Sequence, residues 1–127
     1  MDAAQAISEL MELSSQITAA VVLDGEGAVL ASSSDDETGS ARLGDTTRDL
    51  VGAAGDLGGD TRDVTRVEVE LDEGAIFVVR EGEHTVAATT GPSPTSGLVV
   101  YDLRTCAQSI TTEPKKRRTR KPKEPSE

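Results

Sequence analysis

The side chains that could do chemistry are few and lie far apart in the 127-residue chain. Cys106 is the only cysteine and His84 the only histidine. A thiol nucleophile needs a base within hydrogen-bond reach, and Cys106 instead falls on the apolar stripe of a predicted helix, where a small buried filler is expected. His84 lies beside a turn with no second ligand at metal-binding spacing. The sequence therefore predicts a structural role for both residues.

Two acidic segments invite a metal or phosphate interpretation. Asp24-Gly25-Glu26-Gly27 lacks the carboxylate spacing of a calcium loop and the Lys-Ser/Thr pair of a phosphate-binding loop, so it predicts a turn. Asp35-Asp36-Glu37 could hold a hard cation, but adjacent carboxylates in a polar loop usually repel one another and stay hydrated. We expect no catalytic residue, no metal and no cofactor.

Charge is distributed unevenly along the chain. The net charge is −10, but residues 1–113 hold 6 basic and 21 acidic groups, whereas residues 114–127 hold 7 basic and 2 acidic groups. An acidic body argues against nucleic acid as the partner of a folded domain, because phosphate contacts need a basic surface. The sequence predicts a domain over residues 1–112 and a separate basic tail over residues 113–127.

The tail concentrates seven cations in nine residues: Lys115, Lys116, Arg117, Arg118, Arg120, Lys121 and Lys123. It has no aromatic residue to stack on bases, and two internal prolines oppose a long helix. We expect a solvated, disordered tail. Where it makes an electrostatic contact, its own acidic body ranks first because the tether is short. Nucleic acid and weak attachment to a membrane surface rank lower.

The ends and the apolar segments predict a cytoplasmic protein. No apolar run approaches the roughly 20 residues of a membrane span. Met1-Asp2 opens the chain without the basic region of a secretory signal. A single cysteine cannot form an internal disulfide, which agrees with a reducing compartment.

Residues 64–104 predict three antiparallel strands followed by a helix. Val67, Val69 and Leu71 alternate with charged residues, the period-two pattern of a half-buried strand with one wet face and a free edge. Ala75 to Val79 is continuously apolar and suits a central strand, and His84 to Thr90 forms the third strand. After Pro94, a helix is predicted with Thr95 or Ser96 as its cap and with a buried stripe at Val99, Leu103, Cys106 and Ile110.

The first half predicts a helix, a hairpin and a second helix. Asp2 and Gln5 form a capping box ahead of an apolar face at Ala6, Leu10, Leu13 and Ile17. The apolar runs Ala19 to Leu23 and Ala28 to Ala31 flank the predicted turn and form a β-hairpin.

The second helix is predicted to start at Thr38 or Ser40, to end near Leu57 and to be weakened by three glycines, with a possible break near Gly52. Its apolar stripe is thin: Leu43, Leu50 and Leu57.

This order of elements resembles the roadblock family, named after a dynein light chain. The resemblance covers residues 3–110 and is carried by AAVVLDGEGAVLASS at Ala19 to Ser33 and GLVVYDLR at Gly97 to Arg104. It implies an α/β (α+β) fold in the order αββαβββα. The expected sheet has five antiparallel strands, with the second helix on one face and the terminal helices on the other.

The resemblance also implies a function. Many family members bind Ras-like GTPases as activators or scaffolds, and most are dimers. We therefore expect a non-catalytic, dimeric GTPase regulator of the bacterial branch. The expected contacts are Leu43, Leu50 and Leu57 on the second helix, with Arg66 facing Glu68 of a second copy if the edge strands pair. The alternative is a dimeric adaptor or small-ligand sensor with no GTPase partner.

Overall fold

The computed structural model describes residues 1–34, 36–58 and 65–110. The elements in chain order are α1 (Ala3–Leu13), β1 (Ile17–Leu23), β2 (Val29–Ser32), α2 (Glu37–Gly58), β3 (Arg66–Leu71), β4 (Gly74–Glu81), β5 (His84–Thr90) and α3 (Ser96–Ser109). The predicted order αββαβββα is confirmed. The domain boundary at residue 112 and the whole basic tail lie outside the described residues.

The five strands form one antiparallel sheet in the order β2-β1-β5-β4-β3. β1 and β4 each pair with a neighbour on both sides, as their continuous apolar runs predicted. β3 lies at one edge and pairs Val67 with Val78 and Val69 with Ile76 of β4. Within the described residues its outer edge is unpaired, as the alternating pattern predicted.

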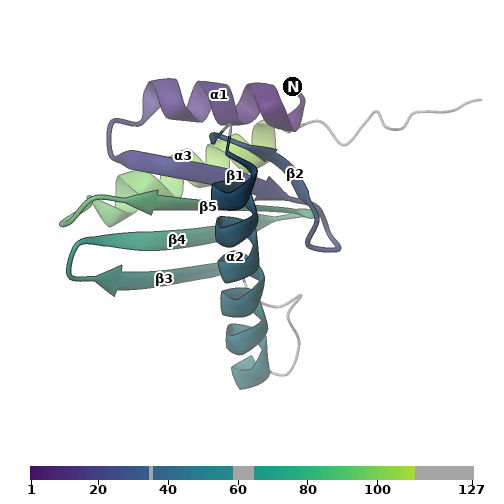
Figure 1. Ribbon diagram of the computed structural model, residues 1–127, viewed down its shortest axis with the longest axis vertical. Coiled ribbons are helices and arrows are strands. Elements are labelled where there is room, and N and C mark those ends of the chain that lie inside the picture. The colour runs from purple at the N-terminus through teal and green to yellow at the C-terminus, as the bar shows by residue number, and fades with distance from the viewer. Residues whose placement is uncertain (35, 59–64, 111–127) are drawn as a thin grey trace, which may run out of the picture.

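Helices cover both faces of the sheet, and each face has its own core (Figure 1). α1 and α3 pack on one face, around the fully buried Phe77. On the other face α2 packs over a smaller cluster made of Val21, Leu23, Val78 and Ala87. Figure 1 shows α2 running across the strands, with its C-terminal turns extending past the β3 edge.

α1 confirms its predicted start but not its predicted apolar face. Asp2 accepts a hydrogen bond from the Gln5 backbone N–H at 2.8 Å, and the Gln5 side chain accepts one from the Asp2 N–H, which completes the capping box. Ala6 and Leu10 are buried, whereas Leu13 is 72% exposed. The prediction for Leu13 and Ile17 was wrong because the helix ends at Leu13 and Ile17 already belongs to β1.

α2 begins earlier than the sequence predicted and does not break. The cap was predicted at Thr38 or Ser40, but the Asp36 carboxylate accepts a hydrogen bond from the Thr38 N–H at 3.1 Å, and the helix starts at Glu37. Aspartate before the first turn satisfies N–H groups that have no partner within the helix. The helix continues through Gly52 to Gly58, so tertiary packing outweighs the low propensity of its glycines.

α3 confirms the predicted stripe, since Val99, Leu103, Cys106 and Ile110 are all buried. Thr95 occupies the N-cap position, but its side chain makes no capping hydrogen bond. Among the described helices, none combines the length and the apolar character needed to cross a membrane.

Candidate interaction surface

The three leucines of the α2 stripe differ in burial, because the helix extends past the edge of the sheet. Leu43 and Leu50 are partly buried against the cluster of Val21, Leu23, Val78 and Ala87. Leu57, one heptad further, is 93% exposed. The first two leucines therefore contribute to the core of the protomer, whereas Leu57 has nothing to pack on within the described part of the chain.

A groove of about 540 Å³ opens beside the N-terminal half of α2. Its floor is the sheet, and its lining is mainly apolar, including Leu43, Ala19, Ile76 and Leu71. Leu71, on the β3 edge, is 62% exposed. α2 is thus too narrow to cover this face of the sheet, and apolar surface remains bare along one side of the helix.

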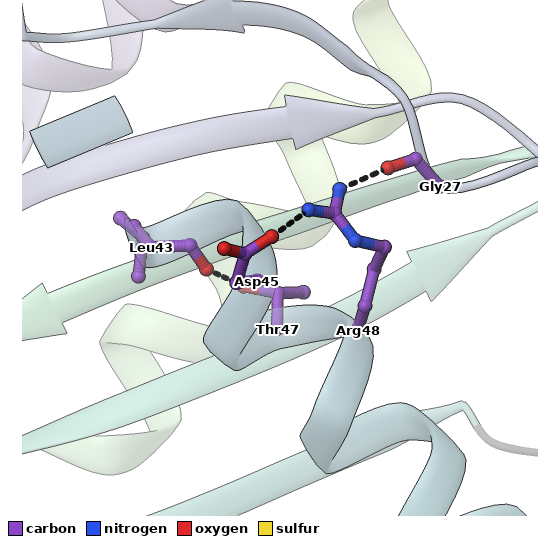
Figure 2. A network of polar contacts seen from close by, with 5 residues as sticks. All are labelled: Gly27, Leu43, Asp45, Thr47 and Arg48. Atoms are coloured by element: carbon purple, nitrogen blue, oxygen red, sulfur yellow. Dashed lines mark hydrogen bonds and ion pairs between the residues drawn. The ribbon is translucent and has the colours of Figure 1, made fainter. Parts of the chain in front are cut away.

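Arg48 fixes α2 against the β1–β2 turn. Its guanidinium donates hydrogen bonds to the Gly27 carbonyl and to Asp45 one turn earlier on the helix (Figure 2). Gly27 has a φ of +88°, and a Cβ there would come within 2.9 Å of Arg48 Cδ. The buried Thr47 donates its hydroxyl to the Leu43 carbonyl at 2.7 Å, which satisfies the one polar side chain that faces this core from α2.

Arg42, at the groove, makes no hydrogen bond or ion pair within the described residues, whereas Arg48 contacts both Gly27 and Asp45. Further along α2, Asp49 and Asp56 are exposed. Carboxylates lie along the whole helix, since Glu37 and Asp45 precede these two. The sequence analysis missed Arg42, Arg48 and the groove, because contacts between segments far apart in the chain leave no periodic signal.

Successive side chains of the edge strand β3 point to opposite faces of the sheet. Val67 packs against the α2-side cluster, whereas Glu68 points the other way and accepts a hydrogen bond from the Ser96 hydroxyl of α3 at 2.9 Å. Arg66 is exposed at the start of the strand. Arg66 and Glu68 are therefore both at the free edge, but Glu68 already has a partner within the protomer.

The segment from Asp24 to Gly27 forms a turn, as predicted, and the Gly27 N–H donates to the Asp24 carbonyl. Asp24 accepts hydrogen bonds from the N–H groups of Glu26 at 2.8 Å and Ala28 at 3.0 Å. These bonds, that from Ala28 first, lower the pKa of the Asp24 carboxyl because they favour its charged form. Among the described residues no group of three or more histidine, cysteine, aspartate or glutamate side chains is arranged to hold a metal. Asp35, part of the predicted acidic loop, lies outside the described residues.

Cys106 lies on the inner face of α3. It is 5% exposed, and burial, with a smaller contribution from the charge of Glu9, raises the pKa of its thiol to about 11. The thiolate is the reactive form of cysteine. This environment therefore disfavours a nucleophilic role.

We expect Cys106 to react slowly with an aromatic disulfide reagent at neutral pH while the protein is folded. In urea the same thiol should react at the rate of a free cysteine. Because Cys106 is the only cysteine, both measured rates belong to it. Fast labelling of the folded protein would contradict this prediction and reopen Cys106 as a nucleophile.

The sequence model of the Roadblock/LC7 domain family matches residues 3–90 of the chain. The chain belongs to the Roadblock/LC7 family. The matched Roadblock/LC7 segment runs from the start of α1 to the end of β5, so it includes α2 and the whole sheet. α3, which the sequence resemblance also covered, lies beyond the match. No curated protein matches the chain.

Solved structures share the Roadblock/LC7 fold. A Roadblock/LC7 domain from Streptomyces avermitilis is 25% identical with a TM-score of 0.72, and the match covers 86% of this chain and 94% of that one. The gliding protein MglB from Thermus thermophilus is 14% identical with a TM-score of 0.59, covering 85% and 87%. Myxococcus xanthus MglB is 10% identical with a TM-score of 0.56, covering 84% and 79%.

Proposed function

We propose that this Roadblock/LC7 chain is a non-catalytic, dimeric regulator or scaffold for a small Ras-like GTPase in the bacterial cytoplasm. The observation that carries the proposal is the α2 face: a leucine that is 93% exposed at the end of a long helix, and a bare apolar groove beside the same helix. Such surface marks a protein contact. Family membership adds the class of partner, since the family resemblance implies Ras-like GTPases.

Two copies related by a two-fold axis can cover each other's bare surface. If the β3 edges lie side by side and antiparallel, the end of α2 that extends past β3 reaches over the sheet of the other copy. Leu57 of one copy then lies over the groove of its twin. The same antiparallel arrangement brings Arg42 toward the C-terminal half of the other α2, which holds Asp49 and Asp56. Opposite charges across the axis favour this orientation.

The runner-up function is a dimeric adaptor or small-ligand sensor with no GTPase partner. The groove favours it, because about 540 Å³ falls within the range of ligand pockets, roughly 300 to 1,000 Å³. In the dimer with antiparallel β3 edges, the second copy would occupy that space. A sensor would instead keep it open for a small apolar molecule.

Affinity capture from an extract of the source cell, with GDP or a GTP analogue added, tests the proposal. We expect a protein with a phosphate-binding loop to be recovered with the full-length chain in at least one nucleotide state. Recovery should fall with Leu57→Asp, because Leu57 belongs to the exposed α2 face on which the proposal rests. If neither state yields such a protein, the adaptor or sensor function takes precedence.

A further inference from the structure

The groove beside α2 is long and narrow. Its lining includes one or more residues from every strand of the sheet: Ser32 on β2, Ala19 on β1, Thr89 on β5, Ile76 on β4 and Leu71 on β3. Neighbouring strands lie about 4.8 Å apart, so the groove is roughly 19 Å long. A volume of about 540 Å³ over that length leaves a mean cross-section of roughly 28 Å². A helix with its side chains is about 10 Å wide, so the groove fits an extended chain and not a helix.

The two ends of the groove differ in charge. Arg42 and Thr46, one turn apart on α2, both line it, and within the described residues neither side chain makes a hydrogen bond or an ion pair. This part of α2 lies over β2, because a Cβ at Gly44 would come within 2.9 Å of Val29 Cγ2. The other charged lining residue is Glu73, in the turn between β3 and β4 at the far side of the sheet. The groove therefore offers a cation and a hydroxyl at its β2 end.

The carboxylates nearest to Arg42 lie outside the groove. Glu37 and Asp45 share with Arg42 the neighbouring surface of α2, and neither lines the groove. Asp45 is already bonded to Arg48. The Arg42 guanidinium keeps its charge at every physiological pH, and its N–H donors are available to a ligand because no described residue accepts from them.

We propose that the groove binds a straight-chain fatty acid. The carboxylate lies at Arg42 and Thr46, because an arginine presents paired N–H donors that match the two oxygens of a carboxylate. The hydrocarbon chain runs across the strands over Ile76 and Leu71, where burial of its methylene groups supplies most of the affinity. The reverse orientation would bring the carboxylate to Glu73, where like charges repel.

The fatty acid and a second copy of the chain compete for the groove. In the dimer with antiparallel β3 edges, Leu57 of the twin lies over the same apolar surface. A bound fatty acid therefore favours the monomer, which makes the ligand a regulator of assembly. This effect on assembly rests on the proposed dimer, whereas binding of the fatty acid in the groove does not.

The probe is dodecanoate, added to the full chain below its micelle concentration. We expect saturable binding by calorimetry and shifts in the amide resonances of Ala19, Ile76 and Thr89, with none at Leu103 in the core of the opposite sheet face. Acetate tests the head group alone and should not bind measurably. Dodecylammonium has the same chain with the opposite charge and should bind at least tenfold more weakly.

Arg42→Gln should weaken dodecanoate binding about tenfold, since a charge-assisted hydrogen bond is lost. Arg42 is exposed, so this variant should fold as the wild type does. Ala19→Leu, which fills the floor of the groove, should abolish binding. Arg104→Gln is the matched control, because it removes the same charge from the opposite sheet face, where Arg104 pairs with Glu81. It should leave the affinity unchanged.

Three results would overturn the fatty-acid site: equal binding of dodecylammonium, an Arg42→Gln affinity within about twofold of wild type, or undiminished binding to a folded Ala19→Leu variant. Light scattering tests the competition separately. Saturating dodecanoate should lower the mass of the wild type toward that of one protomer, and Leu57→Asp should bind dodecanoate at least as tightly as the wild type. A dimer that persists at saturation would refute the competition, whereas a monomeric wild type would refute the proposed dimer and leave the binding results to decide the site.

Discussion

Replacing Leu57 by aspartate is expected to convert the proposed dimer into a monomer at roughly tens of micromolar protomer. Within the protomer Leu57 is 93% exposed, so the change removes no described packing and should leave the fold intact. In a two-fold interface each substitution acts twice. If each lost anchor weakens association by about 2 kcal/mol, the dimer dissociation constant should rise by roughly three orders of magnitude.

Multi-angle light scattering measures this outcome directly, with Leu30→Asp as the matched control. Leu30 is also an exposed leucine, 46% exposed, but it lies on β2 at the opposite sheet edge. Leu50→Asp should also split the dimer, but it is a poorer test because Leu50 packs against the sheet. Arg66→Glu should split it only if strand pairing dominates over α2. A monomeric wild type, or a Leu57→Asp variant that keeps the dimer mass, would refute the α2 interface.

Gly74→Ala is expected to destabilise the fold because the sheet leaves no room for the added methyl group. A Cβ at Gly74 would lie 2.3 Å from the Thr90 carbonyl oxygen, and neither backbone can move without breaking the β4–β5 pairing of Ala75 with Thr90. Forcing extra volume into such a position costs about 1 to 3 kcal/mol. The free energy of unfolding in urea should fall by that amount at a fixed protomer concentration.

Gly52→Ala is the matched control and should change stability in the opposite direction. Gly52 lies inside α2, and a Cβ there meets nothing within 4 Å. Alanine in a helix interior is favoured over glycine by roughly 1 kcal/mol. An unchanged Gly74→Ala variant would show that the β3–β4 turn can shift away from Thr90, contrary to this prediction.

Most of the fold was predictable because it depends on local patterns. The alternation at Val67 and Val69 and the continuous run at Ala75 to Val79 predicted an edge strand and a central strand, and both are confirmed. The error at Leu13 arose because a helical stripe does not encode where the helix ends. At Gly52 the sequence predicted a helix break that does not occur. The low helix propensity of glycine is offset by the packing of neighbouring residues such as Leu50 and Val51.

The candidate site was predictable only in part. Leu43, Leu50 and Leu57 have the same spacing and the same residue type, so the sequence cannot distinguish the two that pack on the sheet from the one that extends past it. That difference depends on where α2 crosses β3. The Arg48 contact with the Gly27 carbonyl and the position of Arg42 at the groove likewise depend on tertiary geometry.

Calorimetric titration of the captured GTPase into the full-length protein tests the central claim most directly. The account predicts saturable binding with the GTPase loaded with GDP or a GTP analogue, in at least one of the two states, and weaker binding to Leu57→Asp. GTP with Mg²⁺ alone should give only the heat of dilution, because the sequence holds no phosphate-binding loop. Heat of dilution with the GTPase in both states, or saturable binding of free GTP, would contradict the account.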